Sequence, residues 1–507
     1  MGEKVYGAAR LRRAAIHFVT GRVVQALARA ALILVIVRIL PVEDYGAYML
    51  IIGLAEAVLL IASLGIVPVG QRYLPELVVR LKPAKVKHFV LFLLGAQTAV
   101  LIVLALGTWA GWTALAKLMN LSAVQAAATY WAPALFLLIP CFRLLCEIQE
   151  ALLEQGRAQI ARALMPVGRI IGIGVYMALG STPGLAELLF LDILVTAGCI
   201  LLAYFNIFST LGQLAQGTDE DIRVREMLRF GWHMAGVNLL GSTMQPGVVR
   251  LVIANGLGVV ETGVYAFLQS LERLVSRYLP GTLLRGLVRP VLVSRAQTEG
   301  GVHTMRAGAS LLIKANLLMV VPGCIIAAVA GDEVVAAASG GKFTDAGFTL
   351  LMFLIVLLVS SQRQVIEMVA QITGQTAMLR ATALIGPVTL AAVWFVAPHG
   401  LNVIILTLAI GSIISNLIRT SVVMRRTAGF RVEWSGMVRI VAAGAVAVVF
   451  GWLMLKFAAA LVATATGLVA FCVVVWLAKP FLREEVALVQ KGFGKRLVKP
   501  LSMLARD

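Results

Sequence analysis

Basic side chains recur inside long apolar stretches of this sequence, where a charge is costly unless it serves a ligand or a partner. They are Arg22, Arg29, Arg273, Arg277, Lys314 and Arg363. Arg22 and Arg29 are seven residues apart and Arg273 and Arg277 are four apart, so each pair shares one face of a helix. Guanidinium and ammonium groups bind phosphate and carboxylate oxygens. The pattern predicts a water-accessible cationic cavity for an anionic ligand.

Two acidic residues, Glu56 and Glu367, also lie within apolar stretches. A charge inside an apolar stretch is costly, so both acids are candidate functional residues. A purely structural alternative stays open, because Arg363 and Glu367 are one helical turn apart. The same alternative holds for Glu272 with Arg273 or Arg277.

Other charges are expected to be structural. Arg143 is spaced to pair with Glu147, Glu150 and Glu154 on one helix. Four arginines lie near enough to the ends of apolar stretches for their side chains to reach water, namely Arg38, Arg169, Arg250 and Arg419. Arg169 has no charged neighbour within its otherwise apolar stretch.

The composition identifies the medium that surrounds these residues. Of the 507 residues, 60% are hydrophobic and 14% are charged, whereas a soluble domain is about half apolar and a quarter charged. We therefore predict an all-α integral membrane protein. The net charge of +19 is explained by basic cytoplasmic loops and their contact with membrane lipids, so nucleic acid is not an expected partner.

Apolar runs predict about fourteen transmembrane helices, since one span needs about 20 residues. Their approximate limits are 16–40, 44–66, 88–112, 128–150, 161–180, 184–208, 229–253, 258–279, 307–330, 346–371, 376–398, 400–424, 436–456 and 459–478. Lys and Arg residues between the spans fall mostly in every second connection. By the positive-inside rule, both termini are then cytoplasmic.

The polar connection 209–228 divides the first twelve helices into two groups of six. We predict an N-lobe over 1–208, a cytoplasmic linker over 209–228, a C-lobe over 229–424, a helix pair over 425–479 and a basic cytoplasmic tail over 480–507. The stretches 40–48 and 257–265 both place an acidic residue before Gly-x-Tyr at the start of a helix. This weak internal repeat is typical of transporters with a substrate path between two lobes.

The sequence offers no basis for catalysis. It contains no GxxxxGK[ST] phosphate loop and no long outer loop with paired carboxylates, and its five histidines are scattered. Its five cysteines lie in apolar stretches without a CxxC pair. We therefore expect neither an enzyme nor a metal site nor a cofactor.

Two short stretches resemble a known family. Residues 38–46 (RILPVEDYG) and 71–76 (QRYLPE) resemble the R-x-L-x-x-x-x-Y-G and R-Y-L-P-E patterns of the Wzx-type polysaccharide and O-antigen flippases. These form the polysaccharide transporter family of the multidrug/oligosaccharidyl-lipid/polysaccharide exporter superfamily. Residues 260–265 (VETGVY) are similar to the matching signature of the second lobe.

The resemblance implies a carrier that moves an undecaprenyl-pyrophosphate-linked oligosaccharide across the bacterial inner membrane by alternating access. By analogy with such carriers, Glu56 and Glu367 are the candidate residues for coupling transport to a proton or to sodium. Such a carrier serves surface polysaccharide or exopolysaccharide biosynthesis, and its partners include polysaccharide polymerase and export machinery. The alternative within the superfamily is a lipid II or multidrug exporter. An alternative of another class is a non-transporting scaffold of a polysaccharide-assembly complex.

Overall fold

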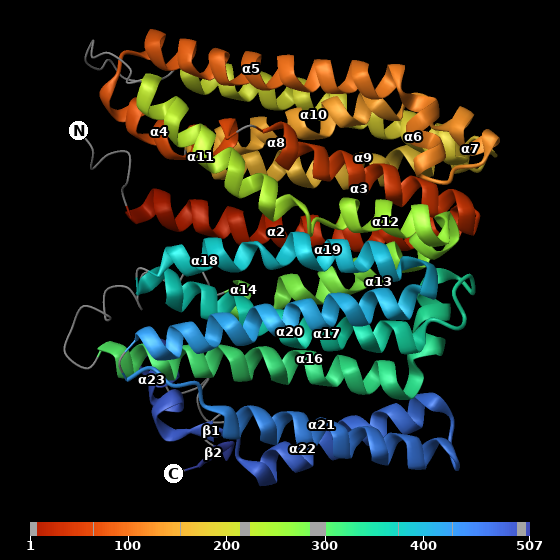
Figure 1. Cartoon of the computed structure of the whole chain (residues 1–507), viewed down its shortest axis with the longest axis vertical. Helices are drawn as coiled ribbons and strands as arrows, with labels where there is room; N and C mark the ends of the chain where they lie inside the picture. The colour runs from red at the N-terminus through yellow and green to blue at the C-terminus, as the bar shows by residue number, and fades with distance from the viewer. Residues whose placement is uncertain are drawn as a thin grey trace. The chain divides into compact units, whose positions relative to one another are not determined.

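The computed structural model describes residues 8–63, 65–152, 154–212, 224–283, 301–373, 375–427, 429–493 and 503–506 (Figure 1). Nearly all of these residues are helical, which confirms the predicted all-α class. Among them, ten helices are long and apolar enough to cross a membrane. The count of fourteen spans stays a prediction.

The chain divides into two compact units, Met1–Ala266 and Phe267–Asp507. Unit 1 contains α2 (Ala8–Ile39), α3 (Val42–Ala62), α4 (Ile66–Arg80), α5 (Pro83–Ala110), α6 (Trp112–Leu118), α7 (Ala123–Ala128), α8 (Ala132–Ala151), α9 (Gln155–Ala178), α10 (Leu185–Leu211), α11 (Val224–Ser242), α12 (Pro246–Leu257) and the first turns of α13 (Val259–Tyr278). The limits of the predicted lobes stay a prediction, and residues 213–223 of the predicted linker lie outside the described residues.

Local sequence explains two features of unit 1 that differ from the predicted spans. Pro246 begins α12, because a proline at the first helical position loses no hydrogen bond, so the stretch expected as one helix over 229–253 is divided. The connection after the second predicted span contains α4. Leu74 and Leu77 of this helix are buried in a core shared with α5, α8 and α10.

The two repeated stretches lie against each other within unit 1. A Cβ atom placed on Gly46 of α3 would be 1.9 Å from the carbonyl oxygen of Val259, at the start of α13. Further along α3, a Cβ on Gly247 of α12 would be 1.9 Å from the carbonyl oxygen of Gly53. Because only glycine permits such backbone contact, these glycines fix how closely α3 approaches α12 and α13.

Unit 2 contains the rest of α13, α14 (Pro280–Leu283), α16 (Gly301–Ser339), α17 (Gly347–Ile372), α18 (Thr376–Ala383), α19 (Ile385–Val396), η1 (Ala397–His399), α20 (Leu401–Arg426), α21 (Trp434–Leu455), α22 (Ala460–Ala478), β1 (Phe481–Leu482), α23 (Arg483–Phe493) and β2 (Ala505–Arg506). Its apolar core joins α16 and α17 to α20, α21 and α22. The two short strands pair in parallel, with Phe481 opposite Ala505. The helix expected over 376–398 is divided at Leu384 into α18 and α19.

Candidate functional site

Three helices of unit 2 bring together two guanidinium groups and one carboxylate. Arg363 and Glu367 lie one turn apart on α17, with Arg363 Nε 3.7 Å from Glu367 Oε1. The same oxygen accepts a hydrogen bond from Arg419 Nη1 of α20. Arg419 Nε donates to Thr382 Oγ1, at the end of α18, over 2.8 Å. Since two cations share one acid, this arginine cluster keeps an excess of positive charge.

The two arginines of the cluster differ in exposure. Arg419 is buried, at 7% exposed, and the expectation that it reaches water is wrong because Glu367 and Thr382 hold it between helices. The Arg363 side chain is 45% exposed. Arg419 therefore positions Glu367, and Arg363 presents a cation to its surroundings.

Arg273 and Arg277 lie on α13, as the spacing predicts. Arg273 is half-buried, and its Nη2 donates to Gln269 Oε1 over 3.1 Å. Arg277 lies one turn further and is exposed. Both belong to unit 2, as Arg363 does. Their presence in one ligand cavity stays a prediction.

Lys314 of α16 lies in a closed cluster of charges. Its Nζ is 2.5 Å from Glu433 Oε2, at the start of α21, and 2.9 and 3.0 Å from the two carboxylate oxygens of Glu485 in α23. The side chains of Lys314 and Glu485 are completely buried. Two carboxylates thus satisfy this cation, and we infer a structural role for Lys314.

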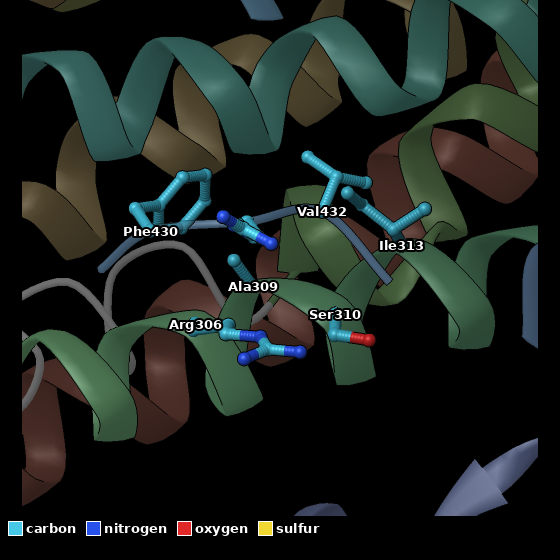
Figure 2. Close-up of a pocket in the computed structure, with 7 residues that line it drawn as sticks. Arg306, Ala309, Ser310, Ile313, Phe430 and Val432 are labelled. Atoms are coloured by element: carbon cyan, nitrogen blue, oxygen red, sulfur yellow. The ribbon is translucent and has the colours of Figure 1, made fainter. Parts of the chain in front are cut away.

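The segment before α21 packs on the first turns of α16 beside this cluster. Figure 2 shows the narrow pocket between them, with Val432 and Ile313 at one end and Phe430 at the other. Phe430 is 2% exposed. Ser310, which also lines the pocket, donates its hydroxyl hydrogen to Glu485. This pocket therefore belongs to the packing around Lys314.

The end of the chain closes the same region. Residues 481–493 and 503–506, here named the C-terminal anchor, contribute Glu485, whose Oε2 accepts the Leu482 amide hydrogen over 2.9 Å. Arg506 Nη2 donates to Glu433 Oε1 over 2.7 Å. The sequence predicts only a basic tail here. The acids within the run REEVALVQ could have indicated that the tail also binds a cation.

The remaining predicted site residues lie in unit 1. The Arg22 side chain falls outside the described residues, and Arg29 of α2 is half-buried. Glu56 of α3 is half-buried and interacts electrostatically with Arg169 of α9. Ligand binding by Arg22 and Arg29 and ion coupling by Glu56 stay predictions.

A second buried ion pair was not anticipated from the sequence. Arg169 Nε lies 2.8 Å from Asp192 Oδ1 of α10, and Tyr48 of α3 donates its hydroxyl hydrogen to Asp192 Oδ2 over 2.8 Å. All three side chains are buried. The expectation that Arg169 stands alone and reaches water is wrong, because its partner lies on another helix. An aspartate inside the apolar run LLFLDILVTAG was the available signal.

Two further arginines also differ from expectation. Arg250 of α12 is buried rather than extended toward water, and its Nη1 donates to the carbonyl oxygen of Met49 on α3 over 2.7 Å. Glu147 and Glu150 of α8 pair with Arg162 of α9, rather than with Arg143 of their own helix. Among the described residues, no group of His, Cys, Asp and Glu could hold a metal ion.

Comparison with known proteins bears on the fold. No protein-family model matches the chain, and no curated protein matches it. A structure of the lipid II flippase MurJ in an inward closed conformation is similar, with a TM-score of 0.66 at 12% sequence identity, over 91% of this chain and 98% of that one. An inward-facing multidrug resistance MATE family transporter of the MOP superfamily gives a TM-score of 0.62 at 13% identity, over 80% of this chain and 96% of that one.

This chain shares the fold of these two transporters over most of their length. Together with the ten long apolar helices found in the described part of the chain, the fold identifies a multi-pass membrane protein.

Proposed function

We propose that the chain is a flippase that moves an undecaprenyl-pyrophosphate-linked oligosaccharide across the bacterial inner membrane for surface polysaccharide or exopolysaccharide biosynthesis. The observation that carries this proposal is the arginine cluster on α17 and α20, where two guanidinium groups share one carboxylate. The similarity to a lipid II flippase supports it, because a lipid phosphate needs such cations inside a membrane fold.

The proposed headgroup site in unit 2 consists of Arg363, Arg273 and Arg277. Arg22 and Arg29 of unit 1 are proposed separately as further ligand-binding cations. A guanidinium offers two parallel donors to a phosphate, so it binds pyrophosphate more specifically than a point charge does. Lys314 is proposed to hold α16 to α21 and α23 through Glu433 and Glu485, rather than to bind the ligand.

Ion coupling is proposed for Glu367, with Glu56 as a second acid. Protonation of Glu367 would remove the charge that holds Arg419 and Arg363. Arg363, the exposed cation of the cluster, would then be available to pyrophosphate, so that proton binding and substrate binding favour each other. We also propose that both chain termini are cytoplasmic, because the positive-inside rule assigns the basic connections to that side.

Accumulation of the substrate tests the proposal. Deletion of the gene should cause a pyrophosphate-linked oligosaccharide to accumulate in the inner leaflet, and mass spectrometry of extracted lipids should identify it. Purified protein in liposomes should move that lipid between leaflets. Unchanged lipids in the deletion strain, with no movement of lipid in liposomes, would contradict the proposal. That result would favour a non-transporting scaffold of a polysaccharide-assembly complex.

The alternative within this fold is a lipid II or multidrug exporter. The similarity to MurJ over 98% of that chain favours lipid II as the competitor. Liposomes that contain equal amounts of lipid II and of the accumulated oligosaccharide lipid distinguish the two by which one moves.

A further inference from the structure

Residues 71–76 (QRYLPE), in the middle of α4, connect this helix to α11 within unit 1. The guanidinium carbon of Arg72 lies 4.7 Å from the centre of the Phe230 ring on α11 and 5.4 Å from the centre of the Tyr73 ring. The Tyr73 and Phe230 rings meet edge to face, with their centroids 5.8 Å apart. These three residues, here named the α4–α11 clasp, hold two neighbouring helices together through cation–aromatic and aromatic contacts (Figure 1).

The backbones of the two helices also approach closely beside the clasp. Gly65, between α3 and α4, has a φ of 79°, which glycine adopts without strain. A Cβ atom on Gly65 would lie 1.9 Å from the carbonyl oxygen of Gly231, the neighbour of Phe230. Contacts of the same kind join the start and the middle of α3 to α13 and α12. The clasp therefore lies at one end of a seam between α3 and the first helices of the predicted C-lobe.

The two helices of the clasp are held in place to different degrees. In α4, Leu74 is buried in the core, and Gln71 Nε2 donates to Glu147 Oε2 of α8 over 2.7 Å. Among the residues of α11 whose burial the structure describes, only Met227 and Gly231 are buried. A segment with few buried residues separates from its neighbours at low cost in free energy. We therefore expect α11, rather than α4, to be the helix that can move.

We propose that the α4–α11 clasp is a latch, which releases α11 from α4 when the seam opens and holds it again when the seam closes. This inference rests on the proposed function, because transport by alternating access requires such an opening. The chemistry of the clasp suits repeated release. Arg72 is exposed, and a cation–aromatic contact at an exposed site changes an equilibrium only about two- to fivefold. A buried ion pair at the same place would resist each opening far more strongly.

The reactivity of a thiol measures how often the clasp opens. Gly231→Cys places a thiol at the buried contact, where the nearest atom to the new Cβ would be Cγ2 of Val69, at 3.2 Å. In the full-length protein in liposomes, a hydrophilic thiol reagent should reach this position only when α11 has moved away. Mass spectrometry of the peptide that contains position 231 gives the rate separately from the native cysteines.

Variants of the clasp should raise that rate. Added to Gly231→Cys, we expect Arg72→Gln to raise it about two- to fivefold and Phe230→Ala about tenfold. The matched controls are Arg80→Gln on α4 and Trp232→Ala on α11, because both side chains are exposed and lie outside the clasp. Equal rates in the Arg72→Gln variant and in its control would overturn the latch, and Arg72→Gln removes an exposed side chain that folding does not need.

A disulfide tests whether transport requires the opening. Val69→Cys together with Gly231→Cys should join α4 to α11 on oxidation, since the two positions are in contact. We expect oxidation to stop movement of the pyrophosphate-linked lipid in liposomes and a reductant to restore it, whereas each single variant transports under both conditions. Undiminished transport by the crosslinked protein would overturn the latch alone. Absence of transport by the unmodified protein would instead overturn the proposed function, and with it the role of the latch in transport.

Discussion

At the scale of single residues, the buried pair of Arg169 and Asp192 should determine whether unit 1 folds. Asp192→Asn leaves the buried Arg169 guanidinium without its counter-charge, and breaking such a pair costs about 3–5 kcal/mol. Tyr48→Phe removes only one hydrogen bond to a charged group, for which about 1.5–3 kcal/mol is expected. Thermal unfolding in detergent measures both, with Glu76→Gln at an exposed pair as the control. An Asp192→Asn protein as stable as that control would contradict the structural role.

A second prediction for single residues concerns ligand binding by Arg273 and Arg277 on α13. We expect the double variant Arg273→Gln, Arg277→Gln to reduce lipid transport, because each charge-assisted contact contributes about 1.5–3 kcal/mol, a ten- to hundred-fold change in affinity. Export per unit of membrane-inserted protein in a deletion strain measures it. Arg80→Gln, at an exposed position on α4, is the control. Normal export by the double variant would mean that Arg273 and Arg277 have a structural role and do not bind the ligand.

At the scale of elements, the C-terminal anchor should stabilise unit 2 through Lys314. Glu485→Leu removes one of the two carboxylates that pair with the buried Lys314 and leaves only Glu433 opposite it. We therefore expect a large loss of thermal stability. Adding Lys314→Met should recover much of it, since an apolar pair can replace a buried ion pair at little cost. Glu484→Gln, an exposed neighbour, is the control. A double variant no more stable than Glu485→Leu would argue against the pairing.

The charge cluster around Lys314 predicts sensitivity to acid. Burial raises the pKa of the Glu433 carboxyl, but the hydrogen bond and charge of Lys314, the Gly436 amide and Arg506 outweigh burial and hold that pKa below its ordinary value. A lowered pKa contributes stability that is present above the ordinary value of 4.5 and lost as pH falls through the folded value. Unfolding temperatures between pH 7 and pH 3 should therefore fall less for Glu433→Gln than for the unmodified chain.

The positions of the helices could be predicted far better than the ion-pair partners of their charged side chains. Apolar run length placed α5, α10 and α20 near their observed limits, because a membrane span must be long and uncharged. Partners such as Lys314 and Glu485, 171 residues apart, come together only through tertiary packing. Spacing along one helix predicts only pairs within that helix. It therefore indicates the pair of Arg363 with Glu367, but not the pairing of Glu367 with Arg419 on another helix.

At the scale of the whole molecule, alternating access requires the predicted N-lobe and C-lobe to move against each other. The predicted second span, observed as α3, meets α12 of the divided seventh span through Gly53 and Gly247 within unit 1. Arg250 adds a hydrogen bond to the α3 backbone at the same contact. If these helices separate during each transport cycle, a larger side chain at Gly247 should favour the separated state.

Gly247→Leu tests this movement. The new side chain cannot occupy the contact, and overpacking costs about 1–3 kcal/mol, which shifts a two-state equilibrium roughly 5- to 150-fold. We expect spin labels on α3 and α12 to report a longer distance, and transport to fall. Gly236→Leu on α11 is the matched control, because a Cβ there meets nothing within 4 Å. Normal transport with an unchanged distance in Gly247→Leu would mean that α3 and α12 move as one body and that the moving boundary lies elsewhere.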